Sequence, residues 1–240
     1  MIAFITSSPF REDVDRPTFS NCNHFVERIC AFLPENPRCL YICSSPDRPD
    51  LNCRFGADIF MAFAHAGVHF SAYRVLDAHN ADLVAQLVAE SDLIVLAGGH
   101  VPTQNAFFQK IKLRQCLQDY SGVVMGISAG SMNCADMVYS QPEEPGESAP
   151  EFARFLPGLG LTKVQILPHY QKVKNYTLDG LRLFEDITYA DSMGNTFYAL
   201  PDFSYIVDDG EGAMLFGEGY RLRNGILEQL TVHGDSFAIK

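Results

Sequence analysis

The sequence lacks the long apolar stretch that a membrane-spanning helix needs. No uninterrupted hydrophobic run approaches the roughly 20 residues required to cross a bilayer. The N-terminus also lacks a basic segment followed by a long apolar one, because residues 1–6 (MIAFIT) have the pattern of a short strand. We therefore expect neither a membrane span nor a secretory signal, and we predict a cytoplasmic protein.

Basic residues are scarce as well. The chain has 18 Lys and Arg against 29 Asp and Glu, which gives a formal net charge of −11. A protein of this charge repels polyanions at long range, and no basic cluster offsets the effect. Nucleic acid and anionic membranes are therefore not expected as partners, whereas a small or weakly charged substrate is. A homodimer is compatible with this composition.

Paired cysteine motifs and metal-binding signatures are missing too. Seven cysteines occur without CxxC spacing, so we predict free thiols in a reducing compartment rather than a disulfide framework. There is no HExxH pattern, and Gly67 interrupts the helix that would be needed to pair His65 with His69. We therefore predict that the protein needs no metal and no other cofactor.

The sequence does contain alternating short apolar runs and longer helical patterns. Its 240 residues are 47% apolar and 20% charged, which fits one domain over residues 1–240. The alternation predicts an α/β fold in which a parallel sheet is flanked by helices in three layers. Predicted strands cover residues 2–6, 39–43, 68–73, 93–97, 123–126 and 164–167, and predicted helices cover residues 25–32, 57–66, 81–89, 103–119, 132–137 and 178–189.

The last third of the chain changes character. Five short apolar runs follow residue 195, separated by Gly-rich and Asn-Gly turns, and these predict β-hairpins appended to the sheet. The runs cover residues 196–200, 204–207, 212–216, 220–223 and 226–231. A Pro-, Glu- and Gly-rich stretch at 141–150 is predicted to be a surface loop.

One serine lies on a glycine-flanked turn. Residues 126–130 read Gly-Ile-Ser-Ala-Gly and lie between a predicted strand and a predicted helix. The G-x-S-x-G pattern in this context is typical of a nucleophile on a sharp strand-to-helix turn. Ser128 is the candidate nucleophile, and the N–H of Ala129 is a candidate donor to an oxyanion.

A second strand end carries Gly98 and Gly99, followed by His100. Glycines allow a substrate carbonyl to approach the backbone closely. The N–H of Gly99 is therefore the second candidate oxyanion donor.

An active serine needs a general base. Among seven histidines, His169 directly follows an apolar strand and could reach the same sheet edge as Ser128, while His233 near the C-terminus is its competitor. The residues by themselves leave both open.

Four motifs in order resemble a known family. These are Gly98-Gly99 before a helix, the G-x-S-A-G turn, Pro168-His169-Tyr170 and Leu200-Pro201-Asp202. Together they resemble the dipeptidase E (aspartyl dipeptidase) and cyanophycinase family of serine peptidases, whose fold is that of class I glutamine amidotransferases. The resemblance extends over most of the chain and is specific mainly from residue 92 to 210.

This resemblance implies a serine peptidase that hydrolyses a small peptide or dipeptide. It implies Ser128 as nucleophile, His169 as general base, and Gly99 and Ala129 as oxyanion donors. Asp202 is the preferred third member of the triad, with Glu143 or Glu144 as the alternative.

The sequence departs from the family pattern at two points. His100 stands where many relatives have Asn. None of Lys172, Lys174 and Arg182 clearly matches the arginine expected for an aspartyl substrate.

Two other functions remain as alternatives. An α/β-hydrolase-type esterase would order its triad as Ser128, Asp208 and His233. A catalytically idle, amidotransferase-like domain would bind a small metabolite, and Ser128 would be an inert turn residue.

The absence of metal-ligand spacing generates a first prediction. Activity of the purified protein should be the same with and without EDTA, because a serine nucleophile does not need a metal-bound water. Activity that disappears in EDTA and returns on addition of zinc would contradict this.

Overall fold

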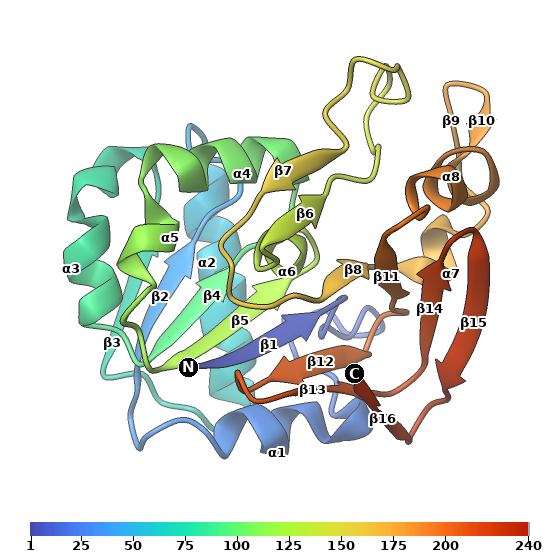
Figure 1. Ribbon diagram of the computed structural model, residues 1–240. Helices are drawn as coiled ribbons and strands as arrows, with labels where there is room; N and C mark the ends of the chain where they lie inside the picture. The colour runs from blue at the N-terminus through green and yellow to red at the C-terminus, as the bar shows by residue number, and fades with distance from the viewer. Residues whose placement is uncertain (240) are drawn as a thin grey trace.

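Five parallel strands form the centre of the molecule. The computed structural model describes residues 1–239 (Figure 1), and the parallel strands are adjacent in the order β1-β5-β4-β2-β3. Every residue of β4 and β5 is buried, as expected of parallel strands covered on both faces. The bounds are β1 Ile2–Thr6, β2 Arg38–Ile42, β3 Ala72–Leu76, β4 Leu93–Leu96 and β5 Val123–Ile127.

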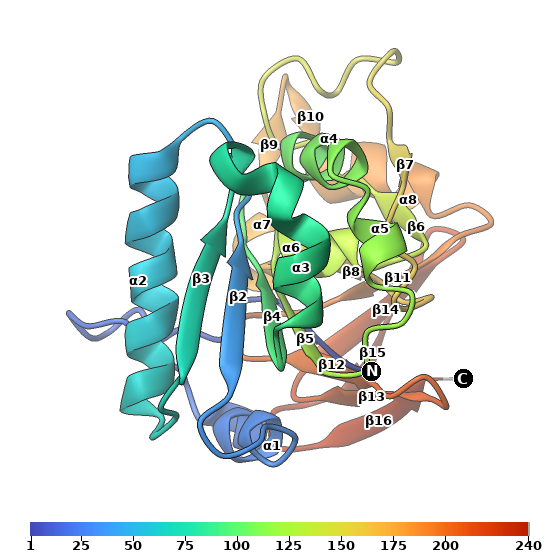
Figure 2. The same cartoon turned by 90° about the vertical axis from the view of Figure 1, so that its left-hand side faces the viewer.

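Helices cover both faces of this sheet, as predicted. Figure 2 shows α2 on one side and α3, α4, α5 and α6 on the other, while Phe25 of α1 packs edge-on against Phe4 of β1 and Tyr205. None of the helices within residues 1–239 combines the length and hydrophobicity needed to cross a bilayer. The bounds are α1 Phe25–Cys30, α2 Pro49–His65, α3 Val84–Ala89, α4 Val101–Lys110, α5 Leu113–Cys116 and α6 Ala129–Asn133.

The C-terminal strands divide between two sheets rather than joining one. Strands β12, β13 and β16 pair antiparallel beyond β1 and extend the central sheet to eight strands. Strands β14 and β15 instead join β11 and β8 in a separate four-stranded sheet, ordered β15-β14-β11-β8. Their bounds are β8 Gln165–Leu167, β11 Thr196–Ala199, β12 Tyr205–Asp208, β13 Ala213–Phe216, β14 Gly219–Arg223, β15 Ile226–Thr231 and β16 Ser236–Ile239.

The helix predicted over 178–189 is wrong for residues 178–182, which form a hairpin instead. Asp179 and Gly180 both have positive φ, the conformation of a tight hairpin turn, and they join β9 (Thr177–Leu178) to β10 (Leu181–Arg182). A π-helical segment, Leu183–Thr188, and the short helix α8, Tyr189–Asp191, follow. The Asp-Gly dipeptide is a hairpin signal, and it outweighed the helical spacing of the apolar residues.

Several other predicted boundaries shift. The strand predicted at 68–73 is β3, four residues later, and the helix over 103–119 divides into α4 and α5 because Lys112 is left-handed, with φ 54°. The helix predicted at 132–137 is α6, which begins directly after Ser128, and Met137 starts β6 (Met137–Tyr139), which pairs with β7 (Phe155–Pro157). The helix predicted at 57–66 begins at Pro49, the one at 25–32 ends at Cys30, and the one at 81–89 begins as a 3-10 turn over Ala78–Leu83.

All seven cysteines are free thiols, as predicted. Cys39, Cys43 and Cys134 are buried, while Cys53 on α2 is exposed and the others are partly buried. Burial raises the pKa of the Cys43 thiol to about 12, so this cysteine packs as a neutral side chain.

Gly130 lets α6 pack directly against the end of β4. A Cβ at this position would lie 2.7 Å from the backbone oxygen of Ala97 and closer still to that of Leu96. We predict that Gly130→Ala lowers the free energy of unfolding by about 1–3 kcal/mol, because backbone atoms must shift to admit the methyl group. Urea denaturation measures this change.

Gly212→Ala is the matched control, because no atom of residues 1–239 lies within 4 Å of a Cβ built there. Equal stability of the two variants would contradict the packing argument.

Candidate active site

Ser128 adopts a strained backbone conformation between β5 and α6. Its φ is 50° and its ψ is −110°, a region that residues with a side chain rarely occupy. The N–H of Ser128 donates to the carbonyl oxygens of Thr6 and Ser7, at 3.1 and 3.0 Å. These bonds from the end of β1 hold the turn in place, so the hydroxyl projects from the strand end as the G-x-S-x-G pattern predicts.

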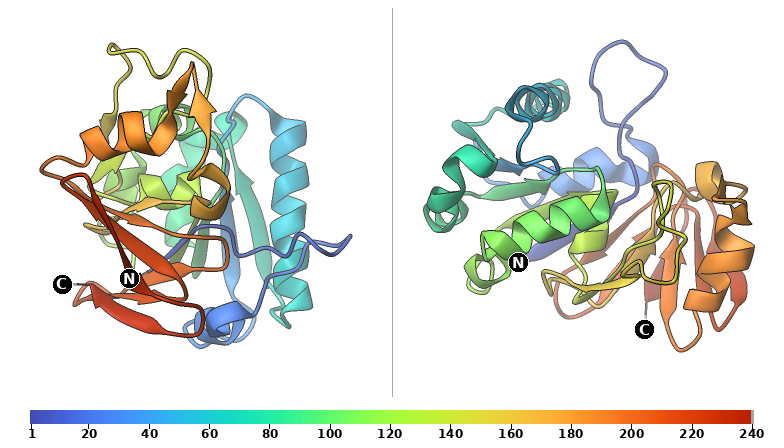
Figure 3. Two further views of the ribbon diagram at one scale, coloured as in Figure 1. Left: turned by 90° about the vertical axis from the view of Figure 1, so that its right-hand side faces the viewer. Right: turned by 90° about the horizontal axis from the view of Figure 1, so that it is seen from above.

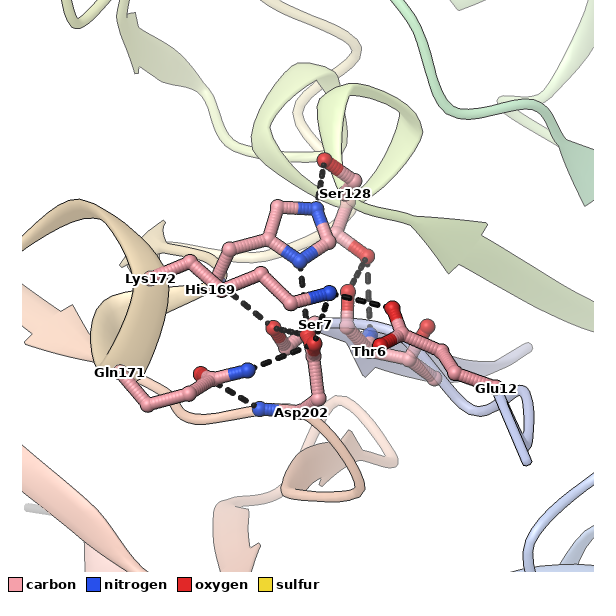
Figure 4. A network of polar contacts seen from close by, with 9 residues as sticks. Thr6, Ser7, Glu12, Ser128, His169, Gln171, Lys172 and Asp202 are labelled. Carbon is pink, nitrogen blue, oxygen red and sulfur yellow. Dashed lines mark hydrogen bonds and ion pairs between the residues drawn. The ribbon is translucent and has the colours of Figure 1, made fainter.

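The imidazole of His169 lies within hydrogen-bonding distance of this hydroxyl. His169 follows β8 and Pro168, has a φ of 56°, and precedes α7 (Tyr170–Val173). Its Nε2 is 2.9 Å from Ser128 Oγ (Figure 4). A hydroxyl at this distance from a neutral imidazole can pass its proton to the ring when it attacks an electrophile.

The carboxylate of Asp202 is hydrogen-bonded to the other nitrogen of the same ring. Its Oδ1 is 2.7 Å from His169 Nδ1, and its side chain is only 7% exposed. Gln171 Nε2 and Lys172 Nζ contact Oδ2 at 2.6 and 2.9 Å, and the Ser7 hydroxyl donates to Oδ1 at 3.0 Å. Burial would raise the pKa of Asp202, but the hydrogen bonds from His169 and Lys172 hold it well below its usual range.

The three residues come together by a different route from the one the sequence predicted. We expected the strands before Ser128 and His169 to be neighbours in one sheet. In fact β5 belongs to the central sheet, whereas β8 and β11, which lead to His169 and Asp202, are parallel neighbours in the four-stranded sheet. The site therefore forms where two sheets meet.

Ser7 joins these two sheets and was missed in the sequence. It follows β1 and is fully buried, accepts a hydrogen bond from the N–H of His169 at 2.7 Å, and donates to Asp202. The available signal was a serine directly after a central parallel strand, at the edge where Ser128 also lies.

The glycine pair lies beside the serine turn. A Cβ on Gly98 would be 3.6 Å from Ser128 Cβ, and one on Gly99 would be 2.7 Å from Ser44 Cβ and closer still to its hydroxyl. Within residues 1–239 the N–H of Gly99 donates no hydrogen bond. Ala129 is the first residue of α6, so its N–H lacks a partner within the helix.

His100, which directly precedes α4, contacts the 141–150 loop through Glu147. Its Nε2 is 2.7 Å from Glu147, and the other oxygen of Glu147 accepts the N–H groups of Glu143 and Glu144 at 2.8 and 3.0 Å. The loop also contacts the β9–β10 hairpin beside it (Figure 3), where Asp179 accepts from the N–H of Gly146. The predicted surface loop is therefore held by hydrogen bonds on both of its sides.

Within residues 1–239, one group of side chains could hold a metal ion. Ligand atoms of His100, Glu144 and Glu147 all lie within 4.8 Å of one another. Independence from metal thus stays a prediction for the EDTA experiment.

The competing triad is not assembled. Asp208 pairs with Ala3 at the far end of β1 from Ser7 and hydrogen-bonds Thr162. His233 is exposed in the turn between β15 and β16.

Two cavities adjoin the serine turn. One of about 200 Å³ includes Ser128, His169 and Gly99 in its wall, together with Gln141, Pro142 and Glu143 of the loop. The other, of about 350 Å³, reaches the same strand ends through Gly98 and Ile127 and is lined by Phe10, Pro17, Tyr41, Phe55, Asp58, Ile59 and Ala97.

Comparisons with known proteins identify the family and the fold. The family model for peptidase family S51 matches residues 15–215. A crystal structure of a peptidase from an acI-B1 actinobacterium is similar, with a TM-score of 0.66 and 16% identity over 99% of this chain and 96% of that one. A Listeria monocytogenes EGD-e protein assigned as a peptidase E gives a TM-score of 0.58 and 15% identity over 96% and 98% of the two chains. No curated protein matches the sequence.

The position of Ser7 generates a further prediction. Ser7→Ala should slow the labelling of the protein by a fluorophosphonate by about tenfold or more, because both the Asp202 carboxylate and the His169 N–H lose a buried partner. The rate of labelling under pseudo-first-order conditions measures this.

Ser8→Ala is the control, since the neighbouring side chain makes no hydrogen bond within residues 1–239. Equal labelling rates in both variants would exclude a positioning role for Ser7.

Proposed function

The chain belongs to peptidase family S51 and is a serine peptidase, and we propose that it hydrolyses small peptides through a triad of Ser128, His169 and Asp202. The observation that carries the proposal is the continuous chain of contacts from Ser128 Oγ through both imidazole nitrogens to Asp202, at 2.9 and 2.7 Å. A nucleophile, a base and an orienting carboxylate in this arrangement suit acyl transfer.

In the proposed reaction, Ser128 Oγ attacks the carbonyl carbon of the scissile bond while His169 Nε2 takes its proton. His169 then gives this proton to the leaving amine, and the C–N bond breaks to leave an acyl group on Ser128. A water molecule, deprotonated by the same imidazole, releases the acid and restores the serine.

Asp202 would stabilise the imidazolium that forms in each half of this reaction. It is ionised at neutral pH, because the hydrogen bonds from His169 and Lys172 outweigh its burial and lower its pKa. A carboxylate bound to Nδ1–H also selects the tautomer whose Nε2 can accept the serine proton.

Attack of Ser128 on the carbonyl carbon gives a tetrahedral intermediate with a negatively charged oxygen. This oxygen would accept hydrogen bonds from the N–H groups of Gly99 and Ala129. Support comes from Gly99 lining the same cavity as Ser128, from Ala129 following Ser128 at the start of α6, and from the lack of an acceptor for the Gly99 N–H among residues 1–239. Donors fixed in advance where charge develops are a large source of rate enhancement.

Substitution of the nucleophile tests the mechanism. Ser128→Ala should lower kcat on a peptide substrate by roughly 10⁴-fold or more, because loss of one triad member disables the whole unit. The same variant should fail to react with a fluorophosphonate, while its circular dichroism spectrum stays that of the wild type.

The two histidines separate the proposed triad from its rival. His169→Ala should lower kcat as severely as Ser128→Ala, and His233→Ala should leave it near the wild-type value. The reverse result would support the α/β-hydrolase order, and full activity of Ser128→Ala would remove the serine mechanism altogether.

A further inference from the structure

The cavity beside Ser128 has an apolar wall with a single acidic group. Of the described residues, 1–239, that line it, none is Lys or Arg, and Glu143 is the only carboxylate. The remaining wall is mostly aliphatic or aromatic, with contributions from α4, α6, α7 and the β9–β10 region. These wall residues are Val101, Met132, Pro142, Pro168, Val173, Tyr176 and Leu183.

The basic residues that follow His169 are engaged outside this cavity. Lys172 pairs with Asp202 and Glu12, and Arg182 forms an ion pair and hydrogen bonds with Asp186. Lys174 lies 5.9 Å from the centre of the Tyr170 ring. An acidic side chain in the cavity would therefore meet Glu143 and no cation, which is unfavourable for an aspartyl residue.

Glu143 itself is an uncompensated carboxylate in a fixed place. Within residues 1–239 its side chain accepts no hydrogen bond and forms no ion pair. The backbone is nevertheless held, because the N–H of Glu143 donates to Glu147, which His100 anchors. The pKa of the Glu143 carboxyl is raised, because partial loss of solvent and the neighbouring carboxylates of Glu147 and Glu144 outweigh the lowering by His100 and His169. A cation bound here would therefore pair with a carboxylate that has no other side-chain partner among residues 1–239 and that lines the same cavity as the catalytic imidazole.

We propose that this cavity binds the N-terminal residue of an unblocked peptide, with an apolar side chain against the aliphatic wall and the α-ammonium group on Glu143. This specificity rests on the function proposed above. An α-ammonium is separated from the scissile carbonyl carbon by one atom, so its partner must line the same cavity as the nucleophile, as Glu143 does. The enzyme is then an aminopeptidase-type hydrolase for neutral N-terminal residues.

The first test compares three substrates that share a coumarin leaving group. The aromatic cavity at Gly98 and Ile127 suits such a group. The wild-type enzyme should have a kcat/KM for leucyl-aminomethylcoumarin at least tenfold above the values for the aspartyl and N-acetyl-leucyl compounds. A preference for the aspartyl compound, or equal rates on the free and acetylated leucyl compounds, would overturn the proposal.

The second test assigns the ammonium to Glu143. Glu143→Gln should lower the ratio of kcat/KM between the free and acetylated leucyl compounds by about 10- to 100-fold, the range for loss of a charge-assisted hydrogen bond. Glu144→Gln, one residue further along the same loop and outside the cavity wall, should leave the ratio unchanged. The ratio cancels any effect on the chemistry common to both substrates, and an equal ratio in the two variants would overturn the assignment.

Fluorophosphonate labelling of Ser128 separates this inference from the proposed mechanism. Labelling of Ser128 without the expected substrate preference would overturn the specificity alone. An unreactive Ser128 would overturn both.

Discussion

The buried carboxylate of Asp202 is the interaction on which the site depends. Burying a carboxylate costs free energy unless its oxygens accept hydrogen bonds from several donors. Here four donor groups reach it, from Ser7, His169, Gln171 and Lys172. Ser7 follows β1 of the central sheet, and the other three follow β8 of the four-stranded sheet. The carboxylate that orients the imidazole therefore also connects the two sheets.

The strained turn at Ser128 depends on the rigidity of the central sheet. A positive φ at a serine is unfavourable by itself and persists where surrounding structure enforces it. The enforcing contacts are the two hydrogen bonds from the Ser128 N–H to the end of β1 and the close packing of α6 on β4 through Gly130. The wholly buried strands β4 and β5 give these contacts a firm base, so the nucleophile is presented in one position.

The loop over residues 141–150 links the fold to substrate choice. His100 binds Glu147 rather than lining the cavity. That bond holds the backbone of Glu143 at the cavity wall. Among residues 1–239, His100 thus helps to position the one carboxylate of a cavity wall that contains no Lys or Arg.

Local patterns in the sequence were sufficient for the α/β class, for most central strands and for Ser128 as a candidate nucleophile, whereas the preference for His169 and Asp202 came from the resemblance to a known family. Each of these signals lies within a short stretch of chain: an apolar strand, a glycine-flanked turn, or a polar residue directly after a strand. The Asp179-Gly180 turn was equally local, yet the helical spacing around it pointed to the wrong element.

Tertiary structure decided everything that depends on pairing between distant segments. It divided the C-terminal strands between two sheets, because strand partners are selected by packing and register rather than by the pattern of any one strand. It brought Ser7 to His169 and Asp202 across more than 160 positions of sequence, and it held Glu143 on the cavity wall through Glu147 and His100. A side chain's neighbours across a sheet boundary are set by how two sheets pack, and no local sequence pattern records that arrangement.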